Sequence, residues 1–251
     1  MPKEWTAREL AKESDFYGGT LERASSLARD GWGGAPKLTG TPLADSLKDH
    51  AEGTTQGTIA STSGAYLDIG AFISGDPECF QEFAPIETPR GLVLGINLSA
   101  AGMVKKEQLA NKGAVMLAIS DTLEKAGFTV SLMAIFSGTS YGAKKVKELY
   151  KFPLKRAGER VDENQLAYWC CHDSAIRQLF FSFQDTQATE EYVEAFKLES
   201  GRGRPRTPKA GEANCDYVFP HTLAPKTTKE AMSDFTNIMG EIEAFLAKGP
   251  S

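Results

Sequence analysis

Two apolar runs of strand length, separated by one stretch of helical periodicity, constrain this chain more than any other feature. Residues 91–98 (GLVLGINL) form the first run and residues 128–136 (FTVSLMAIF) the second. Such runs are typical of strands buried on both faces of a parallel sheet. Residues 106–126 carry apolar side chains at helical spacing, and Gly127 follows where a helix would end. The pattern predicts a strand–helix–strand unit.

The C-terminal half continues this alternation. Residues 165–171 (QLAYWCC) predict a third strand, residues 173–183 a helix that begins at an Asp cap, and residues 215–219 a last short strand. Thr227 and Glu230 have the spacing of a capping box. The helix that they open should bury Met232, Phe235, Ile238, Ile242 and Phe245. We therefore expect an α/β fold with a Rossmann-like, mostly parallel sheet and helices on both faces.

The N-terminal part is less regular. Residues 1–50 predict short helices joined by glycine turns, and the polar residues 50–63 predict a loop or an exposed strand. A short apolar patch follows at 65–73, and residues 78–83 predict one or two helical turns. The expected organisation is a helical or irregular region packed on the core, followed by the α/β domain, with bounds 1–89 and 90–251.

Composition indicates a protein that works without a membrane. Of its 251 residues 41% are apolar, which is enough for a sizeable core, and the net charge is -5. No apolar run approaches the roughly 20 residues of a membrane span, and the charged start of the chain has no secretory leader. The cysteines lack metal-binding spacing and are expected to be reduced thiols: Cys79, Cys170, Cys171 and Cys215. We expect a cytoplasmic location.

Polar residues follow the first apolar run, where parallel sheets place their ligands. The segment GINLSAAGMVKKEQLANKGAVMLAISDTLEKAGFTVSL (95–132) resembles the von Willebrand factor A fold, of the type found in phage-encoded proteins. Looser support comes from YWCCHDSAIRQLFF (168–181) and LARDGW (27–32). The resemblance covers about residues 90–248 and implies the cytoplasm of a phage-infected host cell.

The resemblance implies a metal-binding loop of the pattern Asp-x-Ser-x-Ser. The matching residues here are Asn97, Ser99 and Ala101, and Asp173 matches the later acidic position. Because an amide replaces the carboxylate and one hydroxyl is missing, the affinity for magnesium should fall sharply. We therefore expect a degenerate loop that caps the following helix, with neither a metal nor another cofactor.

Positive charge is concentrated in two stretches of this acidic chain. Residues 142–160 hold seven cations against two anions, and residues 198–209 hold four against one. Together they carry +8, which leaves -13 for the rest of the chain and predicts one basic face. The candidate nucleic-acid contacts are Lys144, Lys145, Lys147, Lys151, Arg202, Arg204, Arg206 and Lys209.

The first stretch also contains the aromatic residues Tyr141, Tyr150 and Phe152. Cationic side chains beside rings on which bases can stack are suited to single-stranded nucleic acid. The alternative is a solvated amphipathic helix whose Val146, Leu149 and Tyr150 face the core.

The second stretch, SGRGRPRTP (200–208), resembles an AT-hook. Gly203 would let the backbone lie deep in a narrow minor groove, where Arg202, Arg204 and Arg206 are attracted by its negative potential. The motif is short enough to occur by chance, so we expect a mobile basic loop that contacts DNA.

No catalytic pattern is present. His172, Asp173 and Ser174 are neighbours in the sequence, whereas a catalytic triad is assembled in space from separate segments. The chain also lacks a phosphate-binding loop, a nucleophile elbow and a zinc-protease motif. We therefore expect a binding protein rather than an enzyme.

Two functions remain open from the sequence. The first is a phage accessory protein that binds single-stranded DNA and supports transcription or replication by coupling it to a protein partner, such as a phage polymerase. The second is a protein-interaction adaptor of von Willebrand A type, a partner of an AAA+ ATPase, which contacts its ligand through Asn97, Ser99 and Asp173 and binds no nucleic acid. A role in the virion also stays open.

Overall fold

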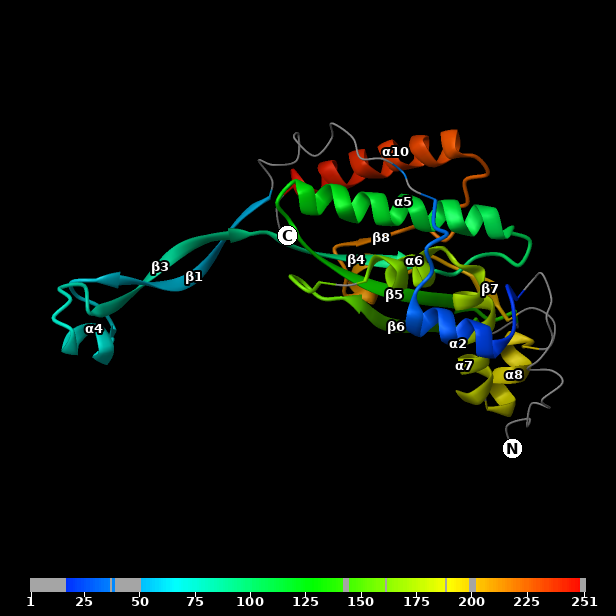
Figure 1. The fold of residues 1–251 in the computed structure, drawn as a ribbon. Helices are drawn as coiled ribbons and strands as arrows, with labels where there is room; N and C mark the ends of the chain where they lie inside the picture. Colours follow the sequence, from blue (N-terminus) through cyan, green and yellow to red (C-terminus); the bar gives the residue numbers. More distant parts are fainter. Residues whose placement is uncertain are drawn as a thin grey trace.

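The computed structural model describes residues 17–36, 38, 51–141, 145–160, 162–187, 189–198 and 202–248 (Figure 1). The strands are β1 (Glu52–Ser61), β2 (Tyr66–Leu67), β3 (Phe80–Pro89), β4 (Gly91–Asn97), β5 (Thr129–Thr139), β6 (Lys147–Lys155), β7 (Arg204–Pro205) and β8 (Tyr217–Val218). The helices are α2 (Leu21–Asp30), α4 (Ile69–Ile73), α5 (Lys106–Lys125), α6 (Glu163–Cys171), the π-helix η2 (Ala175–Phe180), α7 (Phe181–Gln187), α8 (Glu190–Phe196), α9 (Ala210–Ala213) and α10 (Thr228–Leu246).

The body of the molecule is built on a mixed, mostly parallel sheet in the order β6-β5-β4-β8. β4, β5 and β8 run parallel, and β6 runs antiparallel to β5. β4 ends opposite Ile135, and β7 then pairs with Gly138 and Thr139 of β5. Because β6 occupies the other side of β5 there, β7 lies directly beyond the end of β4. The predicted strand–helix–strand unit and the mixed α/β class are confirmed.

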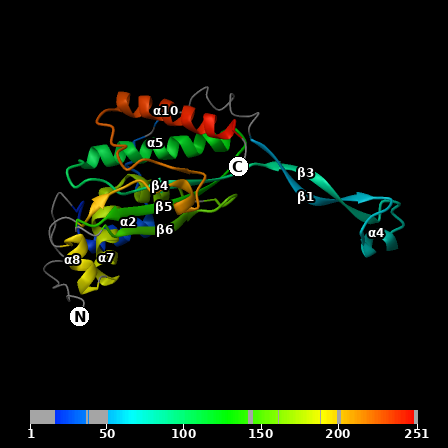
Figure 2. The ribbon, with the colours of Figure 1, turned by 180° about the vertical axis from the view of Figure 1, so that it is seen from behind.

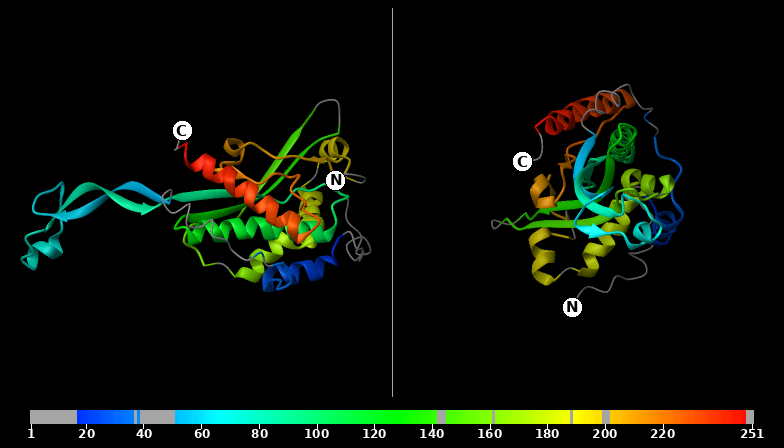
Figure 3. Two further views of the ribbon diagram at one scale, coloured as in Figure 1. Left: turned by 90° about the horizontal axis from the view of Figure 1, so that it is seen from above. Right: turned by 90° about the vertical axis from the view of Figure 1, so that its left-hand side faces the viewer.

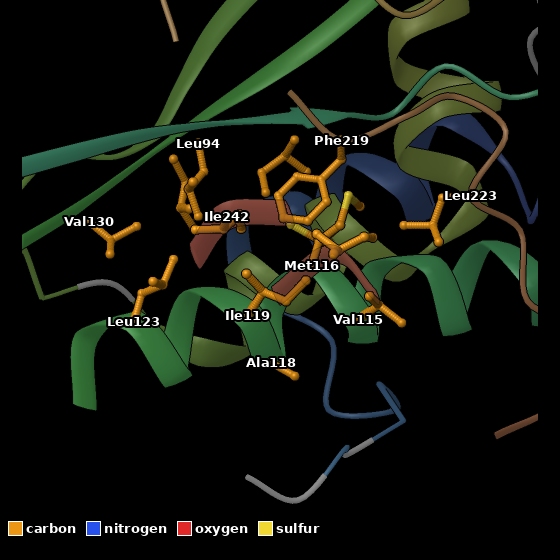
Figure 4. Packing of buried hydrophobic residues seen from close by; sticks show 14 of the residues in the cluster. Leu94, Val115, Met116, Ala118, Ile119, Leu123, Val130, Phe219, Leu223 and Ile242 are labelled. Atoms are coloured by element: carbon orange, nitrogen blue, oxygen red, sulfur yellow. The ribbon is translucent and has the colours of Figure 1, made fainter. Parts of the chain in front are cut away.

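The two faces of the sheet are covered unequally. Leu92, Leu94 and Ile96 of β4 belong to the main core cluster with apolar residues of α5 and α10. Figure 4 shows Leu94 packed with Ile119 and Leu123 of α5 and with Ile242 of α10. The opposite face holds a small cluster of Ile135, Ala213, Cys215 and Val218, so its helical cover in the described chain is the four-residue α9. Helices therefore cover one face of the sheet as expected, whereas in the described chain the opposite face is covered by the short helix α9 alone.

The predicted third strand is wrong, because residues 163–171 form helix α6. The Asp162 side chain caps this helix by accepting from the backbone amides of Asn164 and Gln165. A short apolar run fits a buried helix as well as a strand, and packing against α5 selects the helix. The following helix begins as η2 with Ser174 at its N-cap, rather than at an Asp173 cap.

The alternative of an amphipathic helix near residue 150 is also wrong. Residues 147–155 form the edge strand β6, which pairs with β5. Lys147 and Lys151 lie on one face of this strand, and Tyr150 and Phe152 lie on the other. Pro153, which lacks a backbone N–H, lies on this edge strand next to an irregularity in the pairing with Leu132 and Met133, as is usual for proline in a sheet.

The N-terminal region separates into two parts. Helix α2 packs on α6 and η2, and the Trp32 ring meets the His172 ring edge-on at 4.9 Å. Residues 52–89 instead form an antiparallel hairpin arm that projects from the body (Figures 1 and 2). Residues 80–83 belong to strand β3, which corrects the helical turns expected there.

The predicted C-terminal helix is confirmed as α10, with Thr227 as its N-cap. Phe235, Ile238 and Ile242 are buried as predicted, whereas Met232 and Phe245 are half-buried. The Thr227 hydroxyl accepts from the amide of Glu230, and the Glu230 carboxylate accepts from the amide of Lys226. Among the described helices, none is both long and apolar enough to cross a membrane.

Two glycines in long helices should respond oppositely to alanine. A methyl group at Gly113 of α5 would overlap the backbone carbonyl of Cys170 in α6, whereas a methyl group at Gly240 of α10 meets nothing within 4 Å. We expect Gly113→Ala to destabilise the fold by about 1–3 kcal/mol through overpacking. Gly240→Ala should stabilise it by about 1 kcal/mol, because alanine is the better helix former. Urea unfolding measures both, and equal effects would contradict the α5–α6 packing.

Candidate functional site

A cavity of about 620 Å³ opens at the carboxyl ends of β4 and β5. This is the edge of a parallel sheet at which ligands usually bind. Several elements supply polar side chains to its wall, among them the loop after β4, β5, β6, η2, α7 and β7. These side chains are Tyr17, Ser99, Ser137, Tyr141, Glu148, Arg177, Gln184, Arg202 and Arg204. The position of the candidate loop is therefore as the sequence predicts.

The polar groups of the loop are already used within the protein. The Asn97 side-chain amide donates to the Arg206 carbonyl at 3.1 Å, and its oxygen accepts from the Ser99 amide at 3.1 Å. The Ser99 hydroxyl accepts from the Ser137 amide at 2.7 Å. These bonds tie β4 to β5 and to the segment after β7. They do not cap α5 as expected, because its N-cap is Lys105.

A buried lysine lies beneath this loop. The Lys112 ammonium donates to the Ser99 carbonyl at 2.9 Å, and burial lowers the pKa of Lys112 to about 7. Its charge also contributes to lowering the pKa of His221, after burial of that ring. A cation in this position opposes the binding of a second cation at the strand end.

The residues present do not fit the magnesium site that the resemblance to the von Willebrand factor A fold implies. Asn97 is committed to the loop, Ala101 offers no ligand, and Asp173 makes its described polar contact with His172, whose Nδ1 lies 3.3 Å from Asp173 Oδ1. The structure thus joins Asn97 and Ser99 but gives Asp173 different neighbours. Within the described part of the chain, no group of three His, Cys, Asp or Glu side chains could hold a metal ion.

The side chains of His172 and Ser174 are in contact, but they do not form a catalytic triad. The Ser174 hydroxyl lies 2.9 Å from His172 Nδ1 and 3.1 Å from the Tyr168 hydroxyl. Asp173 approaches the same ring nitrogen, whereas a catalytic triad uses both nitrogens of the ring. Ser174 and Tyr168 are also fully buried, so this cluster is closed to a substrate.

In the described part of the candidate AT-hook, residues 202–208, the chain is a folded segment rather than the mobile loop that we expected. Arg202 makes two hydrogen bonds to Asp185, at 2.7 and 2.8 Å, and stacks on Phe181. Arg206 pairs with Glu212 at 2.9 Å. Arg204 remains exposed, with its guanidinium 5.5 Å from the centre of the Tyr141 ring. Of these arginines, Arg204 is the one on the surface.

Gly203 has a structural reason of its own. Its φ of +78° is one that side chains disfavour, and an added methyl group would overlap the Phe196 ring. The Tyr141 hydroxyl donates to its carbonyl at 2.8 Å. The glycine of the motif therefore serves the packing of β7 against α8.

The basic edge, which we define as residues 145–160, presents most of the predicted lysines. Lys145, Lys147 and Lys151 are exposed, and the Lys151 ammonium donates to the Ala213 carbonyl at 3.2 Å. Lys209 is exposed next to α9 on the same side, whereas Lys144 lies outside the described residues. The pKa of Glu212 falls to about 2, first because Arg206 hydrogen-bonds it and last because Lys147 is near.

The predicted stacking rings differ in their exposure. Tyr150 packs edge-on against Phe180 and Phe183, at 5.4 and 5.7 Å. Phe152 and Phe183 are each 37% exposed, so they offer the aromatic surface beside the edge. Phe183 was missed by the sequence reasoning because only the packing of α7 against β6 brings it there.

Glu148 is a further site residue, which the sequence analysis counted only as an anion of the basic stretch. Burial raises the pKa of this carboxylate, which accepts hydrogen bonds from the Tyr192 hydroxyl and from the Gln184 amide. Arg177, which donates to the Val104 carbonyl, forms another part of the cavity wall. Among the described lining residues, Glu148 is the one carboxylate beside Arg177, Arg202 and Arg204, so the cavity is suited to an anionic ligand.

These observations define a mixed α/β protein with a strand-end cavity, a basic edge strand and a hairpin arm. The chain belongs to the family described as a domain of unknown function, DUF7192, whose model matches residues 3–244. No curated protein and no solved structure matches the chain.

The buried amine predicts a pH-dependent stability. In the unfolded chain Lys112 keeps its proton up to about its usual pKa, so above pH 7 the unfolded state binds more protons and rising pH stabilises the fold. From pH 7 to pH 9 we expect the free energy of unfolding to rise by about 2 kcal/mol more in the native chain than in Lys112→Met. Urea unfolding at both pH values measures this, and parallel profiles would show that Lys112 is not buried as an amine.

Substitution of the paired Arg202 and of the exposed Arg204 should have different effects on the free energy of unfolding. Arg202→Gln breaks a largely buried ion pair and should cost about 3 kcal/mol. Arg204→Gln removes an exposed cation–ring contact and should cost less than about 1 kcal/mol. Chemical denaturation of both variants checks this difference, and equal losses would mean that Arg202 is as free as Arg204.

Proposed function

We propose that the protein binds single-stranded nucleic acid, with DNA favoured, along the basic edge. The observation that carries this proposal is the combination of exposed Lys145, Lys147 and Lys151 with the partly exposed rings of Phe152 and Phe183. Ammonium groups neutralise phosphates, and aromatic rings stack on bases for about 1–3 kcal/mol per base. Lys147, Lys151 and Phe152 lie on strand β6, Lys145 lies just before it, and Phe183 lies beside it on α7.

The geometry favours a ligand that lies lengthwise on β6. Its lysines and its exposed ring project to opposite faces, so a ligand must follow the edge to reach both. In the described sheet β6 is an outer strand, which leaves this side open. Arg204 on β7, near the same end of β5 as Lys147, extends the positive track toward the strand-end cavity.

A single strand suits this surface better than a duplex minor groove. Arg202 and Arg206 are held in ion pairs, and Gly203 is buried with β7 paired to β5. The backbone of the Arg-Gly-Arg-Pro segment therefore cannot enter a groove without unfolding. An extended single strand needs no such insertion.

The cellular role that we propose follows from the resemblance to phage-encoded proteins. The protein would support phage transcription or replication by coupling the bound strand to a protein partner, such as a phage polymerase, without catalysing a reaction. A von Willebrand A-like, Rossmann-like core is part of this proposal. It is supported by the parallel β4–α5–β5 unit with a cavity at its end, although α6 stands where a strand was expected.

A second candidate function is that of a protein-interaction adaptor without nucleic-acid binding, in which a partner such as an AAA+ ATPase occupies the strand-end cavity. The cavity size of about 620 Å³ and its mixed polar and apolar wall favour this candidate. Asn97 and Ser99 would then act by shaping the loop, because their polar groups are bonded internally.

Binding to a labelled single-stranded oligonucleotide tests the leading proposal. The triple substitution of Lys147, Lys151 and Arg204 by Gln should weaken binding at least about tenfold at low salt. It should also reduce the slope of log affinity against log salt by about 2, because each lost phosphate contact removes about 0.7. Fluorescence anisotropy over a salt series measures both quantities.

A matched control substitutes exposed cations on other surfaces by Gln: Lys106, Lys229 and Lys248. This control should bind like the native chain. If both triple variants lost affinity equally, the effect would come from net charge rather than from the basic edge. An affinity that does not change with salt would contradict the proposed electrostatic mechanism.

A further inference from the structure

The tip of the arm exposes a large apolar surface. It is formed by helix α4, by β2 and by the neighbouring parts of β1 and β3, and its exposed side chains are Ile59, Tyr66, Leu67, Ile69, Phe72, Ile73 and Phe83. Ile73 is 78% exposed and Ile69 is 67% exposed. A concentration of exposed apolar side chains on a soluble protein marks an interaction surface.

The same tip is acidic. Residues 58–83 contain Asp68, Asp76, Glu78 and Glu82 and no Lys, Arg or His. Asp68 also shapes the tip, because its side chain accepts from the Ala71 amide and caps α4. A partner for this surface should therefore combine an apolar recess with positive charge, and an anionic membrane surface is disfavoured.

A recess with those properties lies on the body of this chain. A cavity of about 370 Å³ lies between β6, α6, η2 and α7, and its wall includes Phe136, Phe152, Leu166, Trp169, Phe180 and Phe183. Beside it runs the basic edge, residues 145–160, with six cations against two anions. Lys155 of this edge pairs with Glu124, and Lys147 and Lys151 lie on the outer face of β6, at its rim. The acidic, apolar tip and this basic, apolar recess are complementary in both respects.

The arm of one molecule does not reach its own recess. The arm leaves the body where Arg90 precedes β4, and the Arg90 amide closes its base by donating to the Ala51 carbonyl. From there it points away from the sheet, and its ten-residue strands span about 33 Å (Figures 1 and 3). The recess is lined by Ala134 and Phe136 of β5, whereas the arm joins the body next to Thr129 at the start of that strand.

We propose that the arm tip of one copy docks into the recess beneath β6 of a second copy of this chain. Phe72 and Ile73 of α4 enter the recess, and the acidic side chains of the tip face the basic edge. This contact is heterologous, since tip and recess are different surfaces, so two copies close it by exchanging arms. It does not depend on nucleic-acid binding, but it covers Phe152 and Phe183 and therefore competes with a strand bound there.

Sedimentation velocity of the full chain, without nucleic acid, tests the docking. The native chain should show a concentration-dependent rise from monomer to dimer that weakens as salt increases. The tip variant Phe72→Asp/Ile73→Asp and the recess variant Phe183→Asp should each raise the dissociation constant at least tenfold. Met103→Asp, at an 89% exposed apolar residue outside both surfaces, should leave it unchanged.

A mixture of the two variants gives the decisive result. The recess variant retains an intact tip and the tip variant retains an intact recess, so an equimolar mixture should form a heterodimer through one contact. A second recess variant, Phe152→Asp on the edge strand, repeats this test in case Phe183→Asp does not fold, which circular dichroism reveals.

Three results would overturn the docking. If the native chain stays monomeric at every concentration, the proposed self-association is wrong. Association that is lost in the tip variant but retained in both recess variants indicates tip-to-tip pairing, and a folded mixture that stays monomeric removes the complementarity of tip and recess. Because none of these measurements includes DNA, they are independent of the oligonucleotide experiment.

Discussion

The bonds of the buried Asn97 side chain hold together the end of the sheet on which the rest of the site depends. Its amide group donates to the Arg206 carbonyl, and its oxygen accepts from the Ser99 amide. The Ser99 hydroxyl in turn accepts from the backbone amide of Ser137 in β5. Buried polar groups are costly unless they are paired, so this arrangement is strongly specified. It decides where β7 lies, which arginine reaches the surface and how the strand-end cavity is bounded.

The same end of the sheet explains why charge alone is a poor guide to function here. Arg202 and Arg206 are cations in the sequence but hold Asp185 and Glu212 in the structure, and the Lys112 ammonium is buried beneath Ser99. Of the first positive stretch, Lys145, Lys147 and Lys151 stay exposed along the basic edge. The acidic residues of the arm tip balance them at the other end of the molecule, which gives the protein two surfaces of opposite character.

Several elements could be predicted because their signals are local. The continuous apolar residues of β4 and β5, the helical spacing of α5 and the Thr227 cap of α10 each depend on neighbours within a few residues. The segments that failed lacked such a signal. Residues 165–171 are apolar in either a strand or a helix, and residues 147–155 carry charges that suit an edge strand as well as a helix surface.

The sequence by itself determined the parallel core, the strand-end position of Asn97 and Ser99, and the concentration of lysines in 142–160, because backbone periodicity and composition encode them. Only the tertiary structure decided that α6 is a helix, that Arg204 alone of the three motif arginines is exposed, and that residues 52–89 leave the body as an arm with an apolar tip. Those outcomes depend on contacts between segments distant in the chain, and a contact of that kind leaves no trace in the order of neighbouring residues.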